Sequence, residues 1–244
     1  MTPTNIDPAK AVEIAEGIYW VGFNDESAGF RCNPYLILDG DETVFIEPGS
    51  VPHYPIVHNK AVSVARPESI RHIIVSHQDP DLCAAIPKFE EIISPDSRIV
   101  THTRAAVLIA HYGVRSSFYC IDQEGWKLTL KSGRTFRFIF APYLHFPGAF
   151  MTYDERSRIL FSGDLFGAFS FDWNLYANDY YIEAMKAFHE NYMPSREILS
   201  TAMRKLKKLD IAMIAPQHGS IIDRDIARHI EAMETLECGD YLFE

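Results

Sequence analysis

Four apolar, β-rich stretches of this sequence each end in residues that commonly bind metal ions. The stretch RHIIVS leads into SHQDPD, which supplies three candidates, and each of the other stretches supplies one. Glycine or proline lies close to these candidates, turning the backbone sharply and letting side chains converge. The six candidates are His77, Asp79, Asp81, His145 (FIFAPYLHFPGAF), Asp164 (RILFSGDLFG) and His218 (IAMIAPQHGS). Each alone is weak evidence, but six in this order predict a metal site at the ends of several strands.

The spacing of apolar residues predicts strands in two groups. An antiparallel, hairpin-rich start is followed by a buried strand before His77, and a second group of strands follows in the second half of the chain. The runs that predict strands are GIYWVGF, NPYLIL and TVFIEPG (the last two joined by the turn DGDE), RHIIVS, SRIVTHT, WKLTL, TFRFIFAP, AFMTYDE and RILFSGD.

Helices are predicted between these strands and after them. One covers residues 54–65, one begins at Asp81, and one covers RAAVLIAHYG. The last helix is expected to open at Asp223 and to stop before Gly239, since glycine commonly ends helices. Because apolar residues recur at helical spacing from Leu82 to Ile93, the first three ligands should lie between a strand end and a helix start. Strand-rich halves with interspersed helices predict an α/β sandwich, with helices outside two packed sheets.

Length and composition narrow the class of protein. The 244 residues, of which 47% are hydrophobic, predict a single domain spanning residues 1–244. No apolar run approaches the roughly 18 residues that span a bilayer, and no export signal is recognisable. The net charge of −10 disfavours nucleic acid and anionic membranes as partners. Four scattered cysteines without a C-x-x-C pair predict a cytoplasmic protein in which they are small buried residues.

The ordered motifs SHQDPD, LHFPG, SGDLFG and APQHGS, with FIEPGS upstream, resemble the metallo-β-lactamase superfamily over nearly the whole chain. Within that superfamily, Asp79 and the segment AFHENYMPS resemble the diiron domain of flavodiiron proteins and the related oxygen-binding diiron proteins. The resemblance implies a four-layer αββα sandwich, with a binuclear metal site at one edge between the sheets.

Two positions depart from the H-x-H-x-D-H motif of the zinc hydrolases in that superfamily. Asp79 stands in place of its second histidine, and Leu82 in place of its last. The remaining three histidines and three carboxylates favour iron or manganese over zinc, because carboxylate oxygens are harder donors than imidazole. Flavodiiron proteins usually have glutamate at position 79 and commonly histidine at position 82. The apolar Leu82 is expected to make the pocket drier, which favours holding oxygen over reducing it.

The resemblance also implies a role for each candidate. The implied ligands are His77, Asp79 and His145 for one non-heme iron, Asp81 and His218 for the other, and Asp164 as the bridge. Glu47, in FIEPGS, takes the place of an acid that braces the ligand loop, and the alternative is a solvated loop carboxylate. The aromatic segment from Phe166 to Tyr192 is expected to line the site, to form a dimer contact or to pack in the core. No catalytic residue is assigned.

These features predict a diiron protein that binds dioxygen, or nitric oxide, as a sensor or carrier. In flavodiiron reductases a flavodoxin domain follows the diiron domain, whereas this sequence shows no phosphate-binding loop, so two irons and no flavin are expected. The first alternative is an oxygen or nitric oxide reductase that receives electrons from a separate flavoprotein or rubredoxin. A metal-dependent hydrolase is less favoured. The expected assembly is a homodimer, and a sensor would signal to a partner such as a chemoreceptor.

Overall fold

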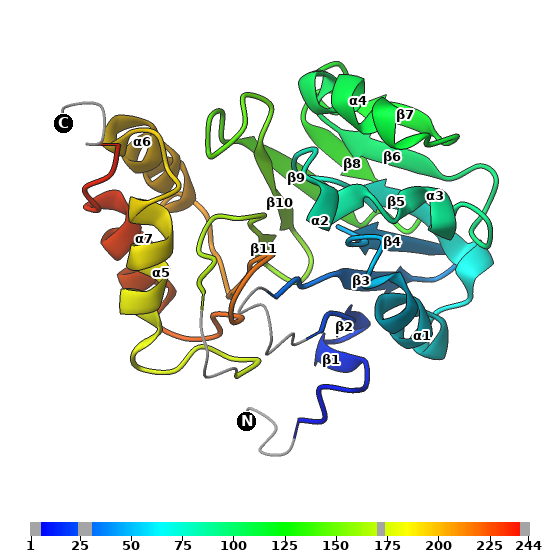
Figure 1. Cartoon of the computed structure of the whole chain (residues 1–244), viewed down its shortest axis with the longest axis horizontal. Helices are drawn as coiled ribbons and strands as arrows, with labels where there is room; N and C mark the ends of the chain where they lie inside the picture. Colours follow the sequence, from blue (N-terminus) through cyan, green and yellow to red (C-terminus); the bar gives the residue numbers. More distant parts are fainter. Residues whose placement is uncertain (1–5, 24–30, 170–173, 240–244) are drawn as a thin grey trace.

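The computed structural model describes residues 6–23, 31–169 and 174–239, which form two β-sheets with helices around them (Figure 1). The strands are β1 (Val12–Ala15), β2 (Ile18–Trp20), β3 (Tyr35–Asp39), β4 (Glu42–Ile46), β5 (Ile70–Ile74), β6 (Arg98–Thr101), β7 (Ser117–Cys120), β8 (Lys127–Thr129), β9 (Thr135–Phe140), β10 (Phe150–Asp154), β11 (Ile159–Phe161) and β12 (Met213–Ala215). The helices are α1 (Tyr54–Val64), α2 (Pro80–Cys83), α3 (Ile86–Phe89), α4 (Thr103–Ile109), α5 (Tyr181–Glu190), α6 (Arg196–Leu206) and α7 (Ile226–Glu234), with short 3-10 turns η1 (Pro67–Ser69) and η2 (Ala110–Tyr112). None of the helices in the described ranges is long and apolar enough to cross a membrane.

The first sheet has the strand order β1-β2-β3-β4-β5-β6-β7. Its first four strands pair antiparallel, and Asp39 pairs with Glu42 across the hairpin turn between β3 and β4. This confirms the hairpin-rich start that the sequence predicts. From β4 to β7 the strands are parallel, so their carboxyl ends lie at one edge of the sheet. The segment that contains SHQDPD leaves the sheet at this edge, directly after β5.

The second sheet has the order β12-β11-β10-β9-β8. Strands β9 and β11 both pair antiparallel with β10, so they run in the same direction, and β12 pairs parallel with β11. The carboxyl ends of β9, β11 and β12 therefore lie at the same edge. The connections that follow these three strands carry the other three candidate ligands.

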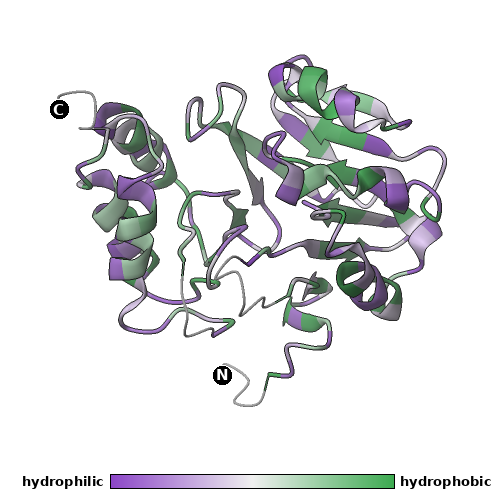
Figure 2. Ribbon diagram, in the orientation of Figure 1, coloured by the Kyte–Doolittle hydropathy of each residue, from purple (hydrophilic) through white to green (hydrophobic). Residues whose placement is uncertain are grey.

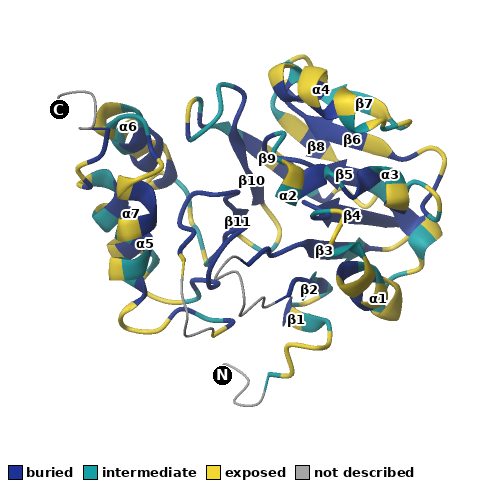
Figure 3. Cartoon of the chain, in the orientation of Figure 1, coloured by how far each residue is buried: buried dark blue, intermediate teal, exposed yellow. Residues whose placement is uncertain are grey.

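Three clusters of buried hydrophobic residues separate four layers. The cluster between the sheets includes Trp20 from the first sheet and Phe136 from the second. A second cluster packs the first sheet against α1 to α4, and a third packs the second sheet against α5 to α7. The two groups of helices lie on opposite sides of the strands in Figure 1. Figure 2 shows mixed hydropathy on these outer helices, and Figure 3 shows their exposed faces beside the buried strands. The predicted αββα sandwich is confirmed.

Two helix predictions are wrong in detail. The helix expected from Asp81 onward is two short helices, α2 and α3, because the N–H of Ala85 donates to the carbonyl of Gly49 (2.9 Å) instead of continuing the helix. The last helix begins at Ile226 and not at Asp223, since Asp225 has a left-handed backbone with φ 52° and helical geometry starts only after it. The sequence patterns also missed β1, β7, α5 and α6.

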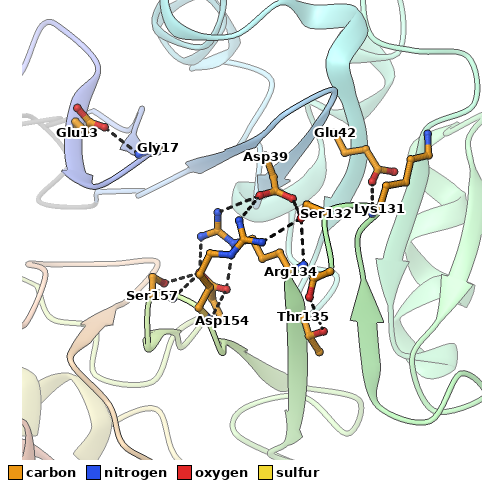
Figure 4. A network of polar contacts seen from close by, with 12 residues as sticks. Glu13, Gly17, Asp39, Glu42, Lys131, Ser132, Arg134, Thr135, Asp154 and Ser157 are labelled. Atoms are coloured by element: carbon orange, nitrogen blue, oxygen red, sulfur yellow. Dashed lines mark hydrogen bonds and ion pairs between the residues drawn. The ribbon is translucent and has the colours of Figure 1, made fainter.

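A polar network around a buried ion pair connects the two sheets (Figure 4). Arg134 donates to both carboxylate oxygens of Asp154, the last residue of β10, and both side chains are almost fully buried. Asp39, the last residue of β3 in the other sheet, lies 3.9 Å from Arg134 Nη1 and accepts a hydrogen bond of 2.6 Å from Arg156. The network therefore fixes the end of one sheet relative to the other.

Replacing Asp154 with alanine should lower the free energy of unfolding by about 3–5 kcal/mol, because it leaves the Arg134 guanidinium buried without its main partner. Equilibrium urea denaturation measures the change. Asp210→Ala is the control, since Asp210 pairs with Arg158 on the surface, where ion pairs contribute little. Equal losses of stability in the two variants would contradict the role given to the buried network.

Candidate metal centre

All six candidates that the sequence identifies come together in the structure. Asp79 immediately precedes α2 and Asp81 lies within it, while His77 lies between β5 and α2. His145 lies between β9 and β10, Asp164 follows β11, and His218 follows β12. The cluster therefore combines one connection from the first sheet with three from the second.

Asp164 lies at the centre of the cluster. Its Oδ2 is 3.4 Å from Nε2 of His77 and 2.9 Å from Nε2 of His145. Its Oδ1 is 3.4 Å from Nε2 of His218. One buried carboxylate thus faces two histidines with one oxygen and a third histidine with the other.

The two remaining aspartates lie on opposite sides of Asp164, one with His77 and His145 and the other with His218. Asp79 Oδ2 lies 3.6 Å from Nε2 of His77 and 3.3 Å from Nε2 of His145. Asp81 Oδ2 lies 3.3 Å from Nε2 of His218. The cluster therefore consists of two adjacent groups of donor atoms that share Asp164.

This donor set fits a pair of metal ions. Around one ion with ligand bonds of about 2.0–2.1 Å, neighbouring ligand atoms lie roughly 3 Å apart, which is close to the contact distances within each group. Nε2 of His77, Nε2 of His145 and Oδ1 of Asp164 are buried and have no hydrogen-bond partner among the described residues. Such atoms are costly to bury unless they bind something. A cation on each side of Asp164 would satisfy all three.

The other ring nitrogens of two histidines are held by the surrounding protein. Nδ1 of His218 donates to the carbonyl of Arg31 (2.6 Å), and Nδ1 of His77 lies 3.1 Å from the hydroxyl of Ser76. These contacts orient the rings so that both Nε2 atoms face the cluster. Partners of this kind are typical of histidines that bind metal.

Glu47 braces the loop that carries His77. It is only 3% exposed, so the alternative of a solvated loop carboxylate is wrong. Its Oε1 accepts from the N–H of Ser76 (3.3 Å), and its Oε2 accepts from the side-chain amide of Gln217 (2.8 Å). Burial raises the pKa of Glu47 to about 7. Glu47 thereby connects the loop of His77 to the loop of His218.

Two glycines permit the close approach of these loops. Gly163 has φ 59°, and a Cβ there would lie 2.7 Å from Oγ of Ser76. Gly219 has φ 76°, and a Cβ there would lie 2.5 Å from the hydroxyl of Tyr181. Since a side chain is disfavoured by both conformation and space, glycine is required beside Asp164 and His218.

Three further residues at the site are not among the six candidates; Cys32 lies in no recognised motif, whereas His189 and Tyr192 lie in the segment AFHENYMPS. Cys32 Sγ lies 3.9 Å from Asp81 Oδ2, although the sequence indicated only a small buried cysteine. His189 accepts from the N–H of Phe166 (3.1 Å) and so steadies the turn that carries Asp164. Tyr192 packs edge-on against His145, with ring centroids 4.5 Å apart.

Some residues of the aromatic segment from Phe166 to Tyr192 line the site, and others pack in the core. Phe188 lies near His218, with ring centroids 6.2 Å apart, so it joins Tyr192 beside the ligands. Phe166 and Tyr181 belong to the core cluster between the second sheet and its helices. Residues 170–173 of the segment lie outside the described residues.

The two sheets and the outer helices have the arrangement of metallo-β-lactamase-like flavodiiron domains. The model of the ODP family beta lactamases matches residues 30–219, and the chain belongs to this family. The structure of the chemotaxis sensor ODP described as its peroxy diiron species is 29% identical and superposes with a TM-score of 0.81, covering 95% of this chain and 97% of that one.

Two longer proteins are also similar. The nitric oxide reductase of Moorella thermoacetica is 30% identical over 92% of this chain and 60% of its own length. The flavodiiron protein of Giardia intestinalis, at 22% identity and a TM-score of 0.80, shares the fold over 96% of this chain and 60% of that one. The chain thus spans about 60% of the length of these relatives.

Histidines and carboxylates in the cluster perturb one another strongly. Burial alone would lower the pKa of His145, but the carboxylates of Asp164 and Asp79 raise it to about 8. Burial likewise lowers the pKa values of His77 and His218, but the neighbouring carboxylates raise them well above the usual value. Burial would raise the pKa of Asp164, yet the histidines beside it hold that pKa well below its usual range.

The affinity for metal should therefore fall as the pH decreases below about 8, where His145 becomes protonated. A histidine nitrogen binds metal only without its proton, so the affinity should fall about tenfold per pH unit for each proton displaced. Titration with Co²⁺ at several pH values between 6 and 8, with proton release measured in weak buffer, tests this. An affinity that is constant over this range would show that no cluster histidine gives up a proton.

Proposed function

We propose that this chain is a diiron protein that binds dioxygen, or another diatomic molecule such as nitric oxide, as a sensor or carrier. The position of Asp164 carries the proposal, because its two carboxylate oxygens face separate groups of donors. The proposed ligands are His77, Asp79 and His145 for one iron, Asp81 and His218 for the other, and Asp164 for both.

Two lines of argument support iron as the metal. Three of these six proposed ligands are carboxylates, which suit iron and manganese better than a set richer in histidine does. In addition, the chain spans 97% of the chemotaxis sensor ODP, for which a peroxy diiron species has been described.

The surrounding residues favour binding without rapid turnover. A bound iron pair would supply the electrons and positive charge that bind a diatomic molecule. Leu82 is fully buried among apolar side chains, so position 82 contributes neither a metal ligand nor a proton donor. Tyr192 lies against His145 and is 44% exposed, which places it between the proposed site and solvent.

The second candidate function is reduction of oxygen or nitric oxide with electrons from a separate flavoprotein or rubredoxin. Its support is the 30% identity to the nitric oxide reductase of Moorella thermoacetica. Hydrolysis is less favoured because Asp79 and Leu82 replace two histidines of the hydrolase motif. We further propose a single domain over residues 1–244, a homodimer, a cytoplasmic location and, for a sensor, a chemoreceptor as the signalling partner.

Iron-replete expression should yield two irons per chain, and Asp164→Ala should lose more iron than Asp79→Ala, since only Asp164 serves both ions. Elemental analysis of the purified variants measures this. Asp41→Ala is the control, because Asp41 lies exposed in the hairpin turn between β3 and β4 and should leave the iron content unchanged. Stoichiometric zinc after iron-replete expression would overturn the proposed metal.

Mixing the reduced protein with oxygen should produce an optical change that lasts far longer than about one second, the longest typical time of an enzymatic turnover. Stopped-flow spectroscopy follows it. Leu82→His should shorten this lifetime by supplying a proton donor, whereas Leu82→Met, which conserves volume and polarity, should not. The iron content of both variants is measured alongside, so that loss of metal is not mistaken for faster decay.

Decay within milliseconds, or rapid and steady oxygen consumption with a generic flavoprotein donor, would instead favour the reductase.

A further inference from the structure

The two halves of the proposed site are unequal. Apart from the shared Asp164, one half has three donors from His77, Asp79 and His145, whereas the other has only Asp81 and His218. The half with fewer donors, that of Asp81 and His218, lies beside the thiol of Cys32. The donor atoms of Cys32, Asp81 and His218 all lie within 4.8 Å of one another.

Cys32 is held at this position by its neighbours on both sides. The Arg31 carbonyl accepts from Nδ1 of His218, and the N–H of Asn33 donates to the carbonyl of Gln217 (2.8 Å). The Asn33 side chain also donates to the carbonyls of Pro216 and Gly219, each at 3.0 Å. The chain around Cys32 is thus bonded to the same loop that carries His218, and the side chain of Cys32 is only 1% exposed.

An observation independent of the thiol indicates a cation on this side of the cluster. Oδ1 of Asp164 faces His218 from a buried side chain and has no hydrogen-bond partner among the residues that the structure describes. A carboxylate oxygen in that position is stabilised by a metal ion. The thiol lies next to the two side chains that would complete the environment of this ion.

We propose that Cys32 is a third terminal ligand of the metal held by Asp81 and His218. This inference rests on the proposed two-metal function and extends it to the ligand set. On binding, the metal–sulfur bond forms as the S–H bond breaks, and the proton leaves to solvent. Because a thiolate is a soft donor, the two metals differ in character: one has only nitrogen and oxygen ligands, while the other has one sulfur ligand.

Titration of the metal-free full-length chain with Co²⁺ tests this ligand, because a thiolate bound to Co²⁺ gives an intense near-ultraviolet charge-transfer absorption that nitrogen and oxygen ligands lack. We expect this absorption with one of the two bound ions. Cys32→Ser should abolish it while at least one Co²⁺ ion still binds. Cys120→Ser is the matched control, because Cys120 is a free cysteine on β7, and this variant should keep the absorption.

X-ray absorption of the unmodified protein loaded with Co²⁺ provides a second measurement that needs no variant. It should show sulfur bound to about half of the cobalt. Two bound ions without charge-transfer absorption or cobalt–sulfur scattering, or an absorption that persists in Cys32→Ser, would overturn the Cys32 ligand and leave the two-metal proposal intact. Failure to bind Co²⁺ at all would overturn both.

Discussion

The site depends on one buried negative charge, the carboxylate of Asp164. An isolated carboxylate costs on the order of several kcal/mol to transfer from water into a protein interior, and Asp164 is only 4% exposed. Three histidine nitrogens within 3.4 Å offset this cost. They belong to three connections far apart in the sequence, so the charge is tolerated only when both sheets have formed and met. The cluster is therefore a consequence of the whole fold and not of one local motif.

The position of the two sheets relative to each other accordingly decides the geometry of the cluster. His77 leaves the first sheet, whereas His145, Asp164 and His218 leave the second. Near the cluster, the Tyr35 hydroxyl of the first sheet donates to the carbonyl of Pro216 (2.9 Å), next to β12. Elsewhere the contacts of Asp39 in the first sheet with Arg134 and Arg156 of the second, and the apolar layer between the sheets, fix the same arrangement. Packing between the sheets thus holds the six side chains of the cluster in place. In smaller metal proteins, closely spaced ligands of one short sequence motif have this role.

The sequence predicted the sandwich and the convergence of six side chains because both follow from local patterns: apolar runs give the strands, and polar residues placed after them mark one edge. Contacts between distant segments were not predictable in this way. Ala85 ends α2 by bonding to Gly49, which no helical periodicity indicates. Cys32 meets Asp81 across 49 positions and lies in no motif. His189 meets Phe166 across 23 positions, and although it lies in AFHENYMPS, that segment did not indicate this contact. Such partners become visible only once the strands are placed.

Leu82 and Cys32 together suggest how this chain differs from the zinc hydrolases that its sequence resembles. Position 82 lies on α2, one residue after Asp81, and here it holds a leucine that is fully buried among apolar side chains. Without a ligand at position 82, a metal ion bound by Asp81 and His218 would have fewer protein donors. The proposed thiol of Cys32 approaches the same two residues from the connection before β3, so the coordination lost on one element is recovered from another. The exchange would replace a neutral imidazole with an anionic sulfur, which would donate more negative charge to a bound metal ion and so stabilise its higher oxidation state.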